Sequence, residues 1–351
     1  MSYDQSTVHT VYADKFASST LHFDLSHELE VAAPIEPKVG DLIVVQTLTD
    51  NSSYNQLELT SGRLARIKIG DVVVGVLGKR RALKGFVGEV PRSIKIGDQL
   101  SLLNLGGLVG KCTGRFHGLG RAISAEVLGC VVQDGRILNI TEKALAPADT
   151  VEHKAPFVLV AGTAMNVGKT QVVAELIKQF TRHGYRAMGA KLSGVAALRD
   201  PLNMEDHGAV KTMSFLDCGL PSTVGLNDIG PLTRTILHHL NQEQPDVILV
   251  EMGDGLIGGY NVDSIFQHED IMKGCAATIL CASDFVGTWG GIQHLAMKGV
   301  KTAVVSGPTT DSPMAIKLIQ DRFETDAANA INEGEVLFQL VEAKVKEWKE
   351  A

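Results

Sequence analysis

Residues 157–170 read Phe-Val-Leu-Val-Ala-Gly-Thr-Ala-Met-Asn-Val-Gly-Lys-Thr, and this stretch decides the fold class of the chain. It opens with five apolar residues, as expected of a strand buried on both faces of a sheet. A glycine-containing loop follows, and Gly168-Lys169-Thr170 opens a segment with helical spacing. A strand, a loop and Gly-Lys-Thr at a helix start form the pattern of a phosphate-binding loop. The strict GxxxxGK[ST] spacing is missed by one residue, because Thr163 stands at its first position.

The loop predicts contacts to a polyphosphate and to a metal ion. Backbone N–H groups of the loop and of the helix start can surround phosphate oxygens. Lys169 would neutralise phosphate charge, and the Thr170 hydroxyl would bind Mg²⁺. The Asn-Lys-x-Asp signature of regulatory GTPases is absent, so we expect ATP with Mg²⁺. The residues expected to bind the nucleotide here are Gly162, Thr163, Asn166, Val167, Gly168, Lys169, Thr170 and Gln171.

Apolar strands alternate with helical segments beyond the loop. This pattern predicts an α/β fold, with a mostly parallel sheet covered by helices on both faces. Ligands of such sheets bind at the carboxyl ends of the strands. The expected strands are 157–162, 185–192, 246–253, 276–283 and 301–307, and the expected helices are 169–183, 229–243, 263–274, 287–299 and 311–348, the last range as one or two helices.

The chain before residue 142 has a different residue pattern, in which short runs of β-branched residues are separated by glycine. The pattern Lys-x-Gly-Asp occurs at 38–41, 68–71 and 95–98, each time before or within a strand-like run. Repeated Gly-Asp turns are typical of an all-β module. We therefore predict a smaller β-barrel or sandwich domain ahead of the α/β domain. The expected divisions are 1–35 as an arm or extra strands, 36–142 as the β domain, 143–156 as a linker and 157–351 as the P-loop NTPase domain.

Composition excludes several classes of protein. The 351 residues carry a formal charge of −7 and are 44% hydrophobic, which favours a folded globular chain over a disordered one. No apolar run approaches the roughly 18–20 residues of a membrane helix, and we expect no membrane association. A pI near 5.9 and 5% aromatic residues argue against a broad nucleic-acid surface. Five scattered cysteines without a CxxC pair, and a start without a secretion signal, favour a cytoplasmic protein with reduced thiols.

The spacing Gly-Thr-x-x-x-Val-Gly-Lys-Thr resembles the loop of dethiobiotin synthetase and its relatives among the dimeric P-loop NTPases. The resemblance covers about residues 157–310, and Ala164 stands where that family usually carries Asp. It implies a catalytic Lys at the end of the second strand, which contacts the transferred phosphoryl group and the substrate. Lys191 and Ser193 are the candidate counterparts. It also implies a homodimer.

An acidic residue ends the expected strand 246–253. A carboxylate at that place can hold Mg²⁺ opposite Thr170. The family reads Val-Glu-Gly-x-Gly-Gly here, so the resemblance implies Glu251 as the metal-site residue. Asp254 adds a second carboxylate, which could bind the metal, bind a substrate amine or cap the loop.

The segment 199–208 and the loop after the last strand complete the expected site. The resemblance implies an acidic metal ligand in 199–208, for which Asp206 is our choice and Asp200 the alternative. A charge at the N-terminus of a helix, where it favours the helix dipole, explains Asp206 equally well. Related NTPases place the loop for the nucleotide base after the last strand, so Pro308 is expected to touch the purine.

Two stretches of the β domain, one basic and one rich in glycine, are candidates for anion-binding sites. Gly78–Gly85 is a compact basic cluster that could bind phosphate, a carboxylate or an acyl-CoA, and a solvated hairpin turn is the simpler interpretation. Gly106–Arg115 contains a Gly-Lys-Cys-Thr run. We exclude it as a second phosphate loop, because no amphipathic helix follows it.

These observations predict an ATP- and Mg²⁺-dependent enzyme. It would activate or phosphorylate a small carboxylate- or carbamate-type substrate, either as a ligase- or kinase-like enzyme or as an NTP hydrolase, with Lys169 and Lys191 as catalytic residues. One alternative is a nucleotide-switched adaptor or cofactor-assembly NTPase that binds a protein partner. Another is a coenzyme A-dependent group transferase whose loop holds the phosphates of coenzyme A.

Overall fold

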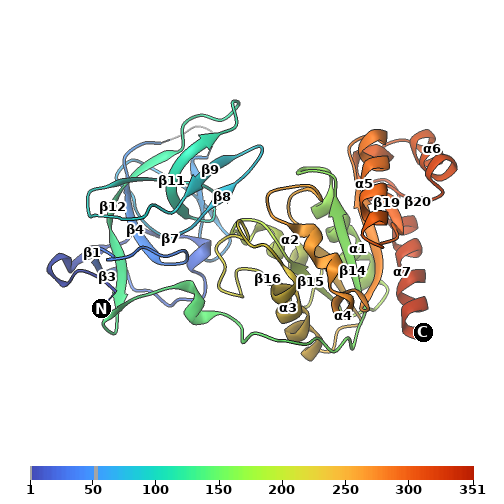
Figure 1. Cartoon of the computed structure of the whole chain (residues 1–351), viewed down its shortest axis with the longest axis horizontal. Coiled ribbons are helices and arrows are strands. Elements are labelled where there is room, and N and C mark those ends of the chain that lie inside the picture. The colour runs from blue at the N-terminus through green and yellow to red at the C-terminus, as the bar shows by residue number, and fades with distance from the viewer. Residues whose placement is uncertain (1, 51–53) are drawn as a thin grey trace. The chain divides into compact units, whose positions relative to one another are not determined.

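The computed structural model describes residues 2–50 and 54–351, and these fall into two compact units (Figure 1). Unit 1 comprises the chain up to Leu145 together with Val195–Arg199 and Phe215–Val224. Unit 2 comprises Ala146–Gly194, Asp200–Ser214 and Gly225–Ala351. Across the described ranges, no helix has the length and apolar character needed to cross a membrane.

Unit 1 is built of short strands. Eleven of them form one sheet with the order β1-β3-β12-β4-β7-β11-β9-β8, while β10 pairs with both β11 and β12. The pairings β12–β4, β4–β7, β7–β11, β11–β10 and β10–β12 therefore close a ring of five strands, as in a barrel. The strands of unit 1 are β1 His9–Tyr12, β2 Lys15–Phe16, β3 Glu28–Ala32, β4 Leu42–Thr47, β5 Gln56–Glu58, β6 Leu64–Arg66, β7 Val72–Leu77, β8 Arg80–Arg81, β9 Phe86–Glu89, β10 Gln99–Leu102, β11 Leu108–Arg115, β12 Ile123–Gln133 and β13 Arg136–Ile137.

The three Lys-x-Gly-Asp stretches form three equivalent corners of this unit. In each, the Asp carboxylate accepts a hydrogen bond from the Lys N–H, at 2.7 Å for Lys38, 2.6 Å for Lys68 and 2.8 Å for Lys95. The glycine between them has φ near +90° every time, a conformation that side chains disfavour. Each glycine N–H also donates to a neighbouring strand, to Leu77 at the end of β7, to Thr47 at the end of β4 and to Val127 within β12. The sequence repeat is thus a structural repeat.

Unit 2 holds a seven-stranded sheet with the order β16-β15-β17-β14-β18-β19-β20, and every pairing in it is parallel. This agrees with the α/β architecture expected from the apolar strands. The strands are β14 Phe157–Gly162, β15 Ala187–Lys191, β16 Thr212–Ser214, β17 Val247–Glu251, β18 Cys275–Cys281, β19 Val304–Ser306 and β20 Asp326–Ala327. The helices are α1 Lys169–Arg182, α2 Arg199–Asp206, α3 Gly230–Gln242, α4 Glu269–Met272, α5 Phe285–Met297, α6 Pro313–Phe323 and α7 Gly334–Glu350.

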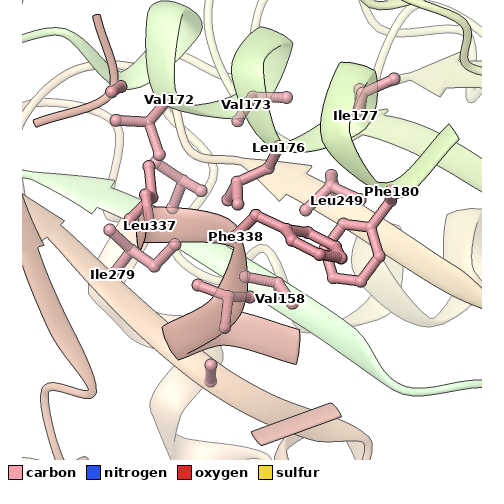
Figure 2. Close-up of a cluster of buried hydrophobic side chains, with 14 of the residues drawn as sticks. Val158, Val172, Val173, Leu176, Ile177, Phe180, Leu249, Ile279, Leu337 and Phe338 are labelled. Carbon is pink, nitrogen blue, oxygen red and sulfur yellow. The ribbon is translucent and has the colours of Figure 1, made fainter. Parts of the chain in front are cut away.

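Helices α1 and α7 cover one face of this sheet. Their apolar side chains meet those of β14, β17 and β18 in one buried cluster (Figure 2). Phe180 of α1 and Phe338 of α7 pack edge to face at its centre, with ring centroids 5.0 Å apart. On the opposite face, α5 approaches closely, because a Cβ on Gly291 would lie 2.7 Å from the side chain of Leu280. The sheet is therefore covered on both faces, and its carboxyl ends are left for a ligand.

One helix prediction differs from the structure in detail, and the expectation of one or two helices over 311–348 is met by two. The expected helix 263–274 is a 3₁₀ turn, Val262–Gln267, followed by the single turn α4. The expected stretch 311–348 is two helices, because α6 ends at Glu324, whose backbone is left-handed with φ 50°. Strand β20 and a turn then separate α6 from α7.

Candidate functional site

The predicted phosphate loop joins β14 to α1 at the centre of the parallel sheet. Two of its residues are left-handed, Asn166 with φ 62° and Gly168 with φ 93°. Val167 between them is buried and anchors the loop, while Ala164 and Asn166 are exposed. Gly168 caps the helix without a side chain, so the first N–H groups of α1 are left for a ligand. With this loop at its centre, the sheet of unit 2 has the arrangement of a P-loop NTPase fold.

Lys169 is folded back onto the loop. Its ammonium donates to the carbonyl oxygen of Ala164 at 2.8 Å and to that of Asp254 at 2.6 Å. Only 6% of the residue is exposed. Burial lowers the pKa of Lys169, and the nearby ammonium of Lys191 lowers it further. A lysine held in this way by neutral carbonyl groups can exchange them for phosphate oxygens, which carry full charge.

A chain of polar side chains links the helix start to the two neighbouring strands. Thr170 donates its hydroxyl proton to Oε1 of Glu251 at 2.8 Å, and Lys191 donates to the same oxygen at 2.6 Å. Lys191 also pairs with Asp200 at 2.7 Å. Burial lowers the pKa of Lys191, but the carboxylates of Asp200 and Glu251 outweigh it and raise the pKa above its ordinary value. Lys191 is therefore charged at neutral pH.

Glu251 has one oxygen without a partner. The residue is 1% exposed, and its Oε2 is buried without a hydrogen bond from any described residue. A buried carboxylate oxygen normally has a donor or a cation, because leaving it unpaired costs free energy. It belongs to the side chain that holds Thr170, so it lies where a Mg²⁺ ion of a nucleotide would need an oxygen ligand. The residues therefore fit such an ion.

No group of three or more His, Cys, Asp or Glu side chains lies close enough to hold a metal ion in the part of the chain that the structure describes. Mg²⁺ at nucleotide sites is typically held by one or two protein oxygens, phosphate oxygens and water. Thr170 and Glu251 form a set of that size.

Two glycines allow the loop after β17 to lie in close contact with the site. A Cβ on Gly253 would lie 2.2 Å from the carbonyl oxygen of Ser193, and one on Gly255 would lie 2.7 Å from that of Thr163. The Ser193 hydroxyl accepts a hydrogen bond from the N–H of Gly253 at 2.9 Å and is fully buried. Ser193 therefore fixes this loop, and its expected contact with a substrate stays a prediction.

The other predicted residues lie as follows. Pro308 is exposed and its Cδ is 3.8 Å from the Cβ position of Gly168, so it adjoins the phosphate loop. Asp254 is left-handed with φ 61°, and a Cβ on Gly258 would come 2.4 Å from its carboxylate. Gln171 is exposed in the first turn of α1. Asp206 is exposed at the last residue of α2, whereas Asp200 of the first turn pairs with Lys191.

Gly307 belongs to the loop after the last strand that was expected near the purine, but its contact with the phosphate loop was not predicted. Its φ is +89°, and a Cβ there would lie 2.4 Å from the carbonyl oxygen of Val167, so the loop after β19 touches the phosphate loop through it. The only sequence signal is its place in a Gly-Pro pair directly after an apolar strand.

No protein-family model matches the chain, and no curated protein matches its sequence. Among solved structures, the signal recognition particle receptor FtsY of Elizabethkingia anophelis matches with a TM-score of 0.41 and 13% identity, covering 60% of this chain and 76% of that one. Chloroplast FtsY of Physcomitrella patens matches with a TM-score of 0.40 and 12% identity, over 57% and 70% of the chains. Cell division protein ftsY of Thermotoga maritima matches with a TM-score of 0.38 and 16% identity, over 57% and 74%. Likeness at this level does not identify a function.

Proposed function

We propose that unit 2 binds a nucleoside triphosphate with Mg²⁺ and hydrolyses it, and that the bound nucleotide switches the protein's interaction with a protein partner. The observation that carries the nucleotide site is the buried, unpaired Oε2 of Glu251 beside Thr170 at the start of α1. Thr170 and Lys191 both contact Oε1, so Oε2 is the oxygen left to accept a cation that arrives with the ligand.

Each side chain of the site has a role in this proposal. The N–H groups of the loop and of the first turn of α1 bind phosphate oxygens, and Lys169 leaves its carbonyl partners to neutralise them. Thr170 and Glu251 hold Mg²⁺, which neutralises charge between the last two phosphates. Lys191 keeps a positive charge beside them, because Asp200 and Glu251 raise its pKa. Positioning and electrostatic stabilisation supply most of such catalysis.

The course of the chain after β15 favours a switch. Lys191 and Asp200 form an ion pair within unit 2, yet Val195–Arg199 between them belongs to unit 1. A nucleotide that draws Lys191 away from Asp200 would break the ion pair of the residue that directly follows Val195–Arg199, a segment of unit 1. A few such contacts that change with the ligand are enough to bias two conformations.

A second candidate is the dethiobiotin-synthetase-like activation of a small carboxylate or carbamate by ATP. The observation in its favour is Lys191, whose charged end adjoins Glu251 at the carboxyl edge of the sheet. A partner protein that stimulates slow hydrolysis supports the switch, whereas turnover of a small acid supports this candidate. The homodimer, the choice of ATP over GTP, and Asp254 as a substrate contact stay predictions.

The test compares the wild-type chain with Glu251→Gln, Lys169→Ala and the matched control Glu347→Gln, whose side chain is 71% exposed. Thermal unfolding is measured with ATP, GTP or coenzyme A, each with and without Mg²⁺, and phosphate release is followed in parallel. A ligand at 100 times its dissociation constant should stabilise the wild type by about 2.7 kcal/mol. We expect Glu251→Gln to lose the part of the nucleotide-induced stabilisation that depends on Mg²⁺. Lys169→Ala should lose most of the nucleotide-induced stabilisation, and the control should keep the wild-type stabilisation with and without Mg²⁺.

Three results separate the alternatives. If Lys169→Ala bound nucleotide and Mg²⁺ as tightly as the wild type does, the assignment of this loop as the nucleotide site would be wrong. Stabilisation by coenzyme A alone would replace the NTPase with the group transferase. Equal dependence on Mg²⁺ in wild type and Glu251→Gln would leave the nucleotide site intact and remove Glu251 from it.

A further inference from the structure

The strongest concentration of charge outside the nucleotide site lies in unit 1. Residues 79–121 contain nine Lys and Arg residues and two acidic residues, in a chain whose net charge is −7. They include the hairpin of β8 and β9 and the whole of the neighbouring β11, which lie together at one end of the sheet order (Figure 1). A local field of this sign attracts anionic partners that the chain as a whole repels.

The strand register shows which charges share a surface. Lys111 of β11 is directly opposite Glu89 of β9, and Arg81 of β8 is opposite Val87 of the same strand. Glu89 is also the partner of Arg81, at 3.4 Å, and of Lys79, at 3.9 Å. One carboxylate therefore pairs with two cations and lies opposite a third, which leaves an excess of positive charge on this face.

Two turns at the end of this face expose apolar side chains among the charges. Leu83 in the β8–β9 turn is 71% exposed, and Phe116 in the turn after β11 is 45% exposed. The two turns are joined, since the N–H of Phe116 donates to the carbonyl oxygen of Gly85 at 2.9 Å. Exposed Lys84 and Arg115 flank them in sequence. We call Arg81, Leu83, Lys84, Lys111, Arg115 and Phe116 the basic tip.

We propose that the basic tip binds an anionic membrane surface, with Leu83 and Phe116 entering the headgroup region and the four cations facing acidic lipids. Cations that flank apolar side chains on two joined turns fit an interface that is negative outside and apolar beneath. Single-stranded nucleic acid also attracts cations, but it needs a row of aromatic platforms, and Leu83 offers no ring for a base to stack on.

This inference differs from the expectation of no membrane association. That expectation rested on the lack of a spanning segment, whereas surface binding needs only a few side chains at one tip. The proposal is independent of the nucleotide site, because every residue it uses belongs to unit 1.

The test is cosedimentation of the full chain with vesicles of phosphatidylcholine alone and of phosphatidylcholine mixed with phosphatidylserine. We expect binding only to the mixed vesicles, and loss of binding when the salt is raised from about 0.1 M to 1 M, where the Debye length falls from about 10 Å to 3 Å. Arg81→Ala with Lys84→Ala should weaken binding about 25-fold, at about fivefold for each charge.

Two further variants make the test specific. Leu83→Ser with Phe116→Ser keeps all charges and should weaken binding by about tenfold or more if both side chains enter the interface. Lys38→Ala with Lys68→Ala removes two exposed lysines from the Lys-x-Gly-Asp corners and should leave binding unchanged. Thermal unfolding of each variant confirms that it is folded.

Several results would overturn the proposal. They are equal binding to both vesicle types, an unchanged affinity in Leu83→Ser with Phe116→Ser, and an equal loss in the Lys38 and Lys68 control. Binding of an oligothymidine strand in place of the mixed vesicles, lost in Arg81→Ala with Lys84→Ala, would assign the tip to nucleic acid instead.

Discussion

At the scale of single residues, the site is a row of alternating charges. Asp200, Lys191 and Glu251 follow one another at 2.7 Å and 2.6 Å, and Thr170 closes the row at the helix start. Lys191 and Glu251 are both buried, so each depends on the other for a counter-charge. This dependence allows the two candidates for an acidic site residue, Asp200 and Asp206, to be separated by experiment.

We predict that Asp200→Asn destabilises the protein by about 1–3 kcal/mol, because Lys191 loses one of its two charged partners. Asp206→Asn is the matched control on the same helix. Its side chain is exposed at the end of α2, so its effect should stay within about 0.5 kcal/mol. Urea unfolding measures both, and nucleotide affinity with and without Mg²⁺ is measured on the same samples. Loss of Mg²⁺ dependence in Asp206→Asn alone would restore Asp206 as the metal ligand.

At the scale of elements, the site depends on how closely loops approach the strand ends. The loop after β17 contacts Ser193 through Gly253, and helix α5 contacts β18 through Gly291. These contacts come from glycine's lack of a side chain, not from its backbone freedom, because neither residue has a positive φ.

Gly253→Ala is predicted to destabilise unit 2 by about 1–3 kcal/mol, because the new Cβ would meet a backbone oxygen that cannot move alone. It should also weaken nucleotide binding, since the displaced loop carries the carbonyl of Asp254 that holds Lys169. Gly290→Ala is the control. No atom lies within 4 Å of its Cβ position on α5, so helix propensity should make it more stable by up to about 1 kcal/mol. Similar losses in both variants would mean that close approach at Gly253 does not matter.

The features of the fold that could be predicted from the sequence are those that depend on neighbouring residues alone. The apolar run of β14, the Gly-Lys-Thr at α1 and the Gly-Asp corners each consist of neighbouring residues, and the structure has all of them. Local patterns identify Asp200 only as an alternative metal ligand, because its pairing with Lys191 depends on the path of the eight residues between them. The contact of Gly307 with Val167 joins residues 140 positions apart, and no local pattern encodes it.

At the scale of the whole molecule, unit 1 is completed by segments from far along the chain. Glu58 is 3% exposed and accepts hydrogen bonds from the hydroxyl of Ser18 at 2.5 Å and from the N–H of Leu198 at 2.7 Å. Asn104 donates to the carbonyl oxygen of Ala196 at 2.6 Å. The core of the β unit thus uses residues that follow β15.

We therefore predict that residues 1–145 alone are less stable than unit 1 in the full chain. Without Leu198, the buried carboxylate of Glu58 loses a hydrogen bond worth about 1–3 kcal/mol. Urea unfolding followed by circular dichroism measures this, since both tryptophans, Trp289 and Trp348, lie outside the fragment. Glu58→Gln in the full chain should lower stability in the same direction. An unfolding midpoint for the fragment equal to that of the full chain would show that 195–199 and 215–224 are dispensable.

The same division of the chain constrains how the protein is made. A ribosome that has released residue 145 has delivered every strand of the five-strand ring, yet the last segment of unit 1 ends only at Val224. At about 5–20 residues per second, the intervening stretch takes roughly 4–16 s to synthesise. Until Leu198 has been made, the nascent β unit holds Glu58 without this partner, while β14, the phosphate loop and α1 are already emerging. The nucleotide-binding segment is therefore synthesised before unit 1 is complete, and β14 finds its strand partners only later, once β17 and β18 have been made.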